Sequence, residues 1–126
     1  PIRSKRDNDG KQHRHDVVME AKTRLKESQA GTTDGPVESE IVQREGYLWL
    51  SARAEAHGFA VNEAEVRVDG YRQHRWHKPN HLIRFSTVEI TGLLTVIDED
   101  RLGETLSQGI GPAKGFGCGL LLVRRV

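Results

Sequence analysis

The sequence predicts an α+β domain, chiefly from the order of its patterned segments after residue 38. A helical pattern comes first, two strand patterns joined by a turn follow, and a second helical pattern precedes a short apolar run. This order lacks only the first strand of a βαββαβ unit, the ferredoxin-like or RRM-like fold. We therefore expect one ferredoxin-like domain over residues 1–126, with an antiparallel sheet and two helices. Its first strand would be largely missing, with Pro1-Ile2 as the end of that strand.

Residues 1–38 are expected to form a polar loop and linker region. Residues 3–16 are polar and charged around the turn signal Asp7-Asn8-Asp9-Gly10. A short helix can be formed by Val17 to Lys22 and the residues after them. The small, turn-forming residues from Ser28 to Pro36 are typical of a flexible link.

The first long helix is expected to begin at Ser39, whose hydroxyl can cap its first turn. Gly58 stands where a left-handed residue commonly ends a helix. Gly46 should weaken this helix by about 1 kcal/mol relative to alanine. The apolar positions expected to share one face are Ile41, Leu48, Ala52 and Phe59.

Two strands and a turn are expected after this helix. Alternation from Glu65 to Asp69 predicts a strand that continues beyond Gly70 as far as Trp76. Residues 77–80 form the expected turn, and residues 82–97 the returning strand. The apolar side of this second strand changes near Thr91-Gly92, which indicates a bend or bulge.

A capped helix, a glycine-rich loop and a terminal strand complete the prediction. Asp98 can cap the helix, which carries Leu102 and Leu106 one turn apart. Residues 120–123 are a short apolar run, as expected of a last strand. Between the helix and this run, five of eleven residues are glycine: Gly109, Gly111, Gly115, Gly117 and Gly119.

The glycine-rich loop is the first candidate site. Such a loop either folds tightly on itself or presents bare N–H groups to a ligand, and Lys114 favours an anionic ligand. Gly115 after Lys114 excludes a P-loop, and the helix-before-strand order excludes a dinucleotide-binding fingerprint. The simpler alternative is that the glycines only permit a tight connection.

The hairpin is the second candidate site, because residues 71–88 contain no carboxylate. Tyr71 and Trp76 stand among its cations as possible stacking surfaces. A cationic two-stranded ribbon suits the groove or phosphates of a nucleic acid, whereas the simpler alternative is a solvated edge protected from aggregation. The candidate binding residues are Arg72, His74, Arg75, His77, Lys78 and Arg84, together with Lys114 of the loop.

Other chemistry is less well supported. His74, His77 and His81 lie near the turn, but neither cysteine nor a carboxylate cluster joins them, so we expect no metal and no cofactor. His74 or His77 could serve as a general acid–base on RNA, although binding is the favoured role for both. The single Cys118 excludes an intrachain disulfide and fits a reducing interior, and no apolar stretch is long enough for a membrane span. A cytoplasmic location with no membrane partner is therefore expected.

Two segments closely resemble the C-terminal half of the CasE family. They are Val88-Glu-Ile-Thr-Gly-Leu-Leu-Thr-Val96 and Gln108-Gly-Ile-Gly-Pro-Ala-Lys-Gly-Phe-Gly-Cys-Gly-Leu-Leu121. CasE proteins are CRISPR-associated endoribonucleases of the Cascade complex, in the RAMP superfamily, whose mark is a C-terminal glycine-rich loop. The resemblance is strong over residues 82–123 and looser over residues 1–81, where Pro1-Ile2 resembles the end of the family's Leu-Arg-Ala-Asn-Pro strand.

The resemblance implies two tandem ferredoxin-like domains that cleave the CRISPR repeat hairpin without metal. In that chemistry the ribose 2′-hydroxyl attacks the adjacent phosphate, a 2′,3′-cyclic phosphate remains, and the enzyme stays bound to its crRNA product. The family's catalytic histidine and its tyrosine neighbour belong to an N-terminal domain that this chain lacks. The resemblance therefore implies that no residue of this chain is catalytic and that the chain alone is inactive.

The resemblance also implies how the chain is used. Arg72 to Lys78 would enter the groove of the RNA stem, while the glycine loop and Lys114 would lie near the RNA path. The implied partners are the repeat stem-loop, other Cascade subunits and the protein's own N-terminal domain. The alternatives are a non-catalytic RNA-binding module, a structural subunit whose basic face meets an acidic protein, and nucleotide binding at the glycine loop.

Overall fold

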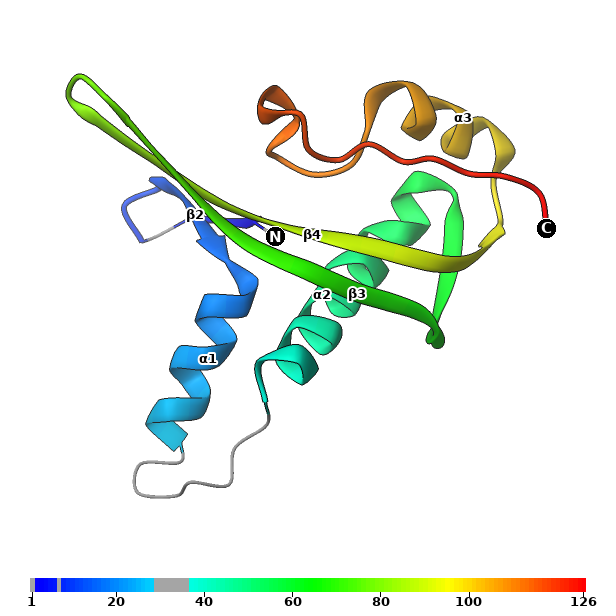
Figure 1. Ribbon diagram of the computed structural model, residues 1–126. Coiled ribbons are helices and arrows are strands. Elements are labelled where there is room, and N and C mark those ends of the chain that lie inside the picture. The colour runs from blue at the N-terminus through cyan, green and yellow to red at the C-terminus, as the bar shows by residue number, and fades with distance from the viewer. Residues whose placement is uncertain (1, 7, 29–36) are drawn as a thin grey trace.

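The computed structural model describes residues 2–6, 8–28 and 37–126, and it confirms the α+β class. Within these ranges, three α-helices and two antiparallel two-stranded sheets are compatible with a ferredoxin-like unit (Figure 1). The elements are β1 (Ile2–Arg6), β2 (Gln12–Asp16), α1 (Val17–Ser28), α2 (Glu38–Ala54), the 3₁₀ turn η1 (Glu55–His57), β3 (Phe59–Lys78), β4 (His81–Val96), α3 (Glu99–Gln108) and the 3₁₀ turn η2 (Lys114–Phe116). Within the described ranges, we find no helix with the length and apolar character that crossing a membrane requires.

The β3–β4 ribbon is the largest element, and its turn end projects beyond the helices (Figure 1). The first strand is longer than predicted, whereas the second has the predicted length and begins one residue earlier. The turn between them is confirmed, with Lys78 paired to His81. The predicted irregularity near Gly92 is also confirmed, because the register shifts between Val61 and Val66, whose partners are Leu94 and Gly92. A second shift lies between Asp69 and Arg72, so the ribbon bends twice before it reaches the turn.

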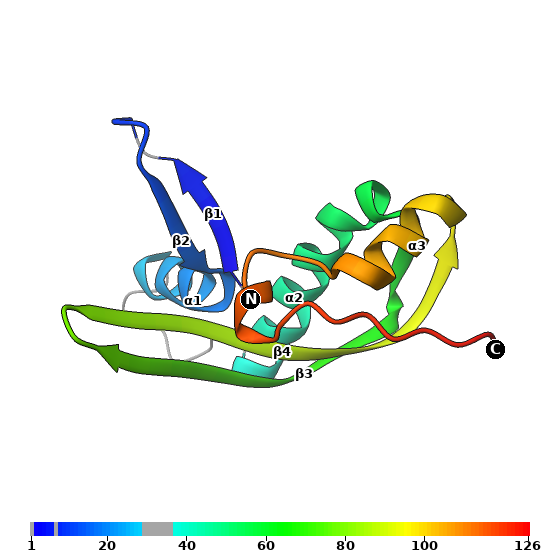
Figure 2. The same ribbon diagram turned by 90° about the horizontal axis from the view of Figure 1, so that it is seen from above.

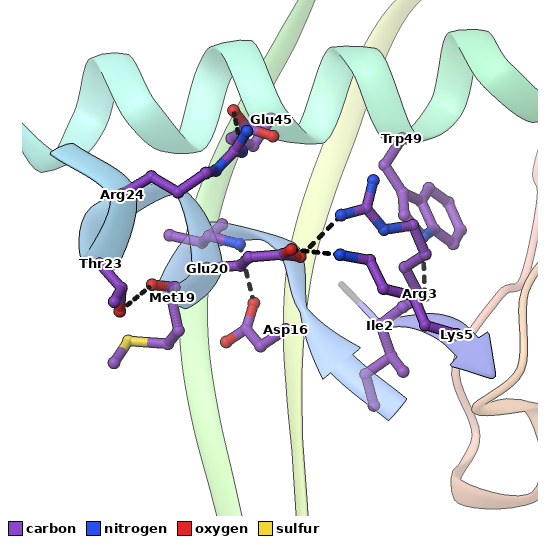
Figure 3. Close-up of polar contacts among 11 residues, drawn as sticks. Ile2, Arg3, Lys5, Asp16, Met19, Glu20, Thr23, Arg24, Glu45 and Trp49 are labelled. Atoms are coloured by element: carbon purple, nitrogen blue, oxygen red, sulfur yellow. Dashed lines mark hydrogen bonds and ion pairs between the residues drawn. The ribbon is translucent and has the colours of Figure 1, made fainter. Parts of the chain in front are cut away.

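The prediction of a polar loop over residues 3–16 is wrong, because β1 and β2 form an antiparallel hairpin there. Figure 2 shows this hairpin standing away from the β3–β4 ribbon. The carboxylate of Glu20 in α1 accepts hydrogen bonds from both Arg3 and Lys5 of β1 (Figure 3). These contacts lower the pKa of the Glu20 carboxyl, and the hydrogen bond from Lys5 is the main cause. Trp49 of α2 donates to the Ile2 carbonyl over 2.9 Å. Contacts distant in sequence therefore order a segment whose polar composition predicts a loop.

The predictions for residues 17–36 have a different outcome. The short helix expected from Val17 is confirmed and runs to Ser28 as α1. Pro1, Asp7 and residues 29–36, which include most of the expected flexible link, lie outside the described residues.

The two longer predicted helices are confirmed, with different details. α2 begins at Glu38 after Val37, without the side-chain cap expected from Ser39. Asp98 caps α3 as predicted, its carboxylate accepting from the Arg101 N–H over 3.1 Å. Leu102 is buried, whereas Leu106 one turn later is exposed.

The buried face of α2 differs from the predicted one. Leu48 and Ala52 are exposed, and Phe59 begins β3 instead of continuing the helix. Besides Ile41, the buried positions follow a four-residue spacing and include a glycine: Val42, Gly46, Leu50 and Ala54. The face of α2 that packs on the ribbon is therefore centred on the smallest residue of the helix.

The core consists of two neighbouring clusters. The first joins both long N-terminal helices to β3 through Val17, Val18, Ala21, Ile41, Val42, Val66 and Val68. The second joins the end of α2 to α3 and the residues after it through Leu50, Ala54, Phe59, Leu102 and Ile110. Gln43 adds a polar contact, since its amide donates to the Val66 carbonyl and accepts from the Val68 N–H, both over 2.8 Å.

The predicted last strand is wrong: within residues 118–126, Leu120 is 73% exposed and Leu122 is 82% exposed, and the segment forms no strand. In a βαββαβ sheet the first strand lies between the third and the last, so the last strand needs the first as its neighbour. Among the described residues no strand occupies that place beside β4. A groove of about 1590 Å³ lies there, with β4 on one side and residues 118–126, which we call the terminal run, on the other.

Gly46 permits close approach of α2 to the ribbon, which yields a prediction. An added Cβ would lie closer than 3.0 Å to Val68 Cγ1 in the first core cluster. We expect Gly46→Ala to lower the free energy of unfolding by about 1–3 kcal/mol through overpacking, although helix propensity alone predicts a gain of about 1 kcal/mol. Urea denaturation measures the change.

Gly103→Ala is the matched control. Gly103 lies in α3 with nothing within 4 Å of an added Cβ. This substitution should raise the free energy of unfolding by about 0.5–1 kcal/mol. Equal gains in the two variants would contradict the packing role of Gly46.

Candidate nucleic-acid interface

The register of the ribbon distributes the predicted binding residues over its two faces. Because successive side chains of a strand alternate, Arg72, His74 and Lys78 share one face of β3, together with Trp76. Arg75 and His77 lie on the opposite face, where Arg75 is paired directly with Arg84 of β4. Two like charges paired across strands repel each other. An anion bound between them would reduce this repulsion. The structure therefore places cations on both faces of the projecting end.

An aromatic cluster joins the ribbon to the glycine-rich loop. The Phe85 ring stacks on His74 at 4.9 Å between centroids and on Phe116 of the loop, also at 4.9 Å. Trp76 lies 5.1 Å from Phe85 and 6.2 Å from Phe116. Phe85 is buried by these neighbours, although it lies on the face of the ribbon that α2 does not cover. The two sites that the sequence indicates separately are thus one continuous surface.

The phenylalanines of this cluster were not among the predicted site residues. Nothing in the local pattern indicates that Phe85 and Phe116, which lie far apart in the chain, meet face to face. The predicted stacking role of Tyr71 is wrong, because its ring and its hydroxyl are already in contact with other residues. The hydroxyl donates to Asp16, and Lys22 lies 5.6 Å above the ring. The pKa of the hydroxyl is raised, mainly by burial and next by the hydrogen bond to Asp16. Trp76 remains exposed, as expected of a stacking surface.

The glycine-rich loop is folded on itself for most of its length. The Ile110 N–H donates to the Gly119 carbonyl over 2.9 Å, which closes the loop at its base. At Gly119 (φ +85°) an added Cβ would lie closer than 3.0 Å to the Ile110 carbonyl, and at Gly111 (φ +90°) it would lie 2.8 Å from the Trp49 ring. The simpler alternative, a tight connection, therefore explains these two glycines.

The tip of the same loop is open. At Gly115 and Gly117 an added Cβ would meet nothing within 4 Å. Lys114, Gly115 and Phe116 form η2, in which none of the residues is buried. The base of the loop is thus tightly packed, while its tip carries Lys114 and places the Phe116 ring against Phe85 of the ribbon.

Positive potential extends below the loop tip. The pKa of His57 is lowered, first by burial and then by Lys114 and Arg53, and its ring is hydrogen-bonded to the Thr105 hydroxyl over 2.8 Å. Arg53 lies 4.2 Å above the Trp49 ring, and burial lowers its pKa most, followed by repulsion from Arg3. An arginine nevertheless stays charged near neutral pH, so this side of the loop is cationic.

Two of the histidines near the ribbon turn, His74 and His81, have polar neighbours in the structure. A ring nitrogen of His74 lies 2.9 Å from the Thr87 hydroxyl, and His81 lies 2.9 Å from the Asn80 carbonyl. Over residues 2–6, 8–28 and 37–126 the structure groups no three His, Cys, Asp or Glu side chains around a possible metal position. Cys118 is half-buried, with its thiol beside the Phe116 carbonyl.

Comparison with known proteins points to one family. The family model described as "CRISPR associated protein" matches residues 1–125. The CRISPR system Cascade subunit CasE of Escherichia coli is 50% identical over 81 residues, which are 64% of this chain and 39% of that protein. The CRISPR-associated endoribonuclease Cse3 of Thermus thermophilus is 34% identical over 89 residues, 63% of this chain and 42% of that protein. The matches thus span about two fifths of each relative, and no solved structure matches.

The division of the loop into a packed base and an open tip is testable with two alanine variants. Gly119→Ala forces a side chain into the left-handed region and against Ile110, so the free energy of unfolding should fall by about 1–3 kcal/mol. Gly115→Ala should change it by less than about 0.5 kcal/mol. Thermal unfolding of both variants measures this difference, and equal losses would show that the tip is packed too.

Proposed function

The chain belongs to the CasE family of CRISPR-associated proteins, and on this premise we propose that it is the RNA-binding C-terminal part of a crRNA-processing endoribonuclease. Its substrate would be the repeat stem-loop of the precursor RNA, and its product would stay bound within Cascade. The observation that carries the proposal is the continuous cationic surface formed by the ribbon end and the glycine-loop tip.

The charge distribution supports RNA as the ligand. Residues 71–88 and residues 109–126 contain no carboxylate, although Asp and Glu make up 18 of the 126 residues. Cations stand on both faces of a ribbon that projects beyond the helices (Figure 1). A slender cationic ribbon can follow a groove and reach phosphates on either side of it.

We propose that the catalytic groups lie outside this chain. The cleavage we propose needs no metal: the 2′-oxygen attacks the neighbouring phosphorus, its proton passes to a base, and the 5′-oxygen leaves with a proton from an acid. The products are a 2′,3′-cyclic phosphate and a 5′-hydroxyl. His74 and His81 are already hydrogen-bonded within the ribbon, and His57 is bonded to Thr105. These contacts favour binding or structural roles for the three imidazoles.

The groove beside β4 supports the proposed tandem-domain arrangement. An extended strand placed there would pair with the edge of β4 and cover apolar residues of the second core cluster. The relatives are more than twice as long as the matched segments, so they contain enough chain for a further domain. We propose that a segment preceding residue 2 supplies this strand, and that other Cascade subunits contact the remaining surface.

Removing three cations from the ribbon tests the RNA-binding role. The combined substitution Arg72→Ala, Arg75→Ala and Lys78→Ala should weaken binding to a repeat stem-loop by at least about tenfold at low salt. The slope of log affinity against log salt should fall by about 2–3, since about one counterion is released per contacted phosphate. Fluorescence anisotropy across a salt series measures both quantities.

The control removes the same charge from the opposite side of the molecule. Arg24, Lys26 and Arg44 are exposed cations of α1 and α2. Their combined substitution by alanine should leave the salt slope unchanged. An equal loss in both triple variants would mean that total charge, and not the ribbon, governs binding.

Cleavage assays distinguish a processing enzyme from a non-catalytic module. The present chain should bind the stem-loop without cutting it. A protein extended to the full length of the relatives should cleave the same RNA in excess EDTA and leave a cyclic phosphate, which gel mobility before and after acid treatment detects. Binding without cleavage by the extended protein would favour the non-catalytic RNA-binding module.

A further inference from the structure

Two aromatic side chains of the surface are partly exposed, and the proposal above assigns no ligand to their outer faces. Trp76 is 49% exposed and Phe116 is 43% exposed, although both touch the buried Phe85 ring. We propose that Trp76 and Phe116 form a stacking platform for an unpaired base that flanks the RNA stem. This inference rests on the proposed function and adds a second kind of contact to it.

The geometry of the rings suits stacking. The planes of Trp76 and Phe116 are 17° apart, and their centroids are separated by 6.2 Å. Phe85 and His74 support them from within the ribbon, with the His74 and Trp76 planes 15° apart. The two rings are nearly parallel and are held in place by a packed neighbour. A base that stacks on one of them therefore binds a side chain that is already ordered, which lowers the entropic cost of binding.

The surroundings of the platform favour a nucleotide over an apolar peptide. Arg72 and Lys78 share the ribbon face of Trp76, and Lys114 precedes Phe116 by two residues. A base on the platform would therefore have cations near its phosphates. An apolar partner would have to desolvate these charges without compensation, whereas a nucleotide supplies an anionic group and a flat ring together.

The structure also argues against packing as the whole explanation of the cluster. Of Phe85, Trp76 and Phe116, Phe85 alone is buried. Any large apolar side chain at positions 76 and 116 could cover its ring. Burial does not require the two outer rings to be aromatic or nearly parallel. Base stacking requires a flat aromatic face, and it accepts every base because each has a flat π-face.

The test uses three RNAs built on one repeat stem-loop. The first carries short single-stranded extensions at both ends, the second carries abasic extensions with the same phosphates, and the third has none. The unsubstituted chain should bind the first about tenfold more tightly than the second. Trp76→Leu and Phe116→Leu should each remove most of that preference while leaving affinity for the bare stem within about twofold. Trp76→Tyr keeps an aromatic ring and should retain the preference.

The outcomes separate this inference from the proposed function. Equal binding of base-containing and abasic extensions by the unsubstituted chain would overturn the platform, and salt-dependent stem binding would still support the proposed function. If Trp76→Leu lowered the affinity for all three RNAs equally, with normal thermal unfolding, the platform would also be overturned. Trp76 would then act by maintaining the shape of the ribbon. Absence of any stem binding would overturn the proposed function itself. Quenching of Trp76 fluorescence by the first RNA but not the second, with Trp76→Leu giving the background from Trp49, would support stacking directly.

Discussion

The indole of Trp49 is the contact on which the arrangement of the molecule depends. It lies on α2, donates to the Ile2 carbonyl, lies beneath Arg53 and packs against both core clusters. Gly111 brings the glycine-rich loop directly against its ring. Three segments that are distant in sequence, the β1 hairpin, α2 and the loop base, thus meet at one side chain. Because the loop base is held there, its tip has a defined position relative to the ribbon.

That defined position converts two weak sequence signals into one surface. A glycine-rich loop and a basic hairpin are each common features of surface regions, and each has a plain structural explanation. The stack of Phe116 on Phe85 places them together, so in the proposed function the cations of both segments would act on the same ligand. Preorganisation of this kind would lower the ordering cost of binding RNA, because the loop and the ribbon are already in contact before the ligand binds.

The groove between β4 and the terminal run shows a sheet whose hydrogen bonding is incomplete within the described chain. Leu93, Val96, Leu120 and Leu122 are exposed along or beside it. Such an open edge with apolar neighbours is normally covered in a folded protein. In the proposed tandem-domain arrangement a preceding segment would cover this edge, and the same strand would give the terminal run the partner that it needs for pairing.

The amino-acid sequence by itself determined the features that depend on local pattern. These are the helices capped at Asp98 and ended near Gly58, the alternating ribbon with its turn, the carboxylate-free end and the glycine-rich loop with its family resemblance. Periodicity, capping and turn chemistry act between near neighbours, so they can be read along the chain. Tertiary structure alone decided the β1–β2 hairpin, the glycine-centred face of α2, the unpaired terminal run and the meeting of Phe85 with Phe116. Each of these depends on contacts between segments remote in sequence, or on a neighbouring strand. Local sequence patterns cannot predict such contacts, because they reflect interactions between near neighbours only.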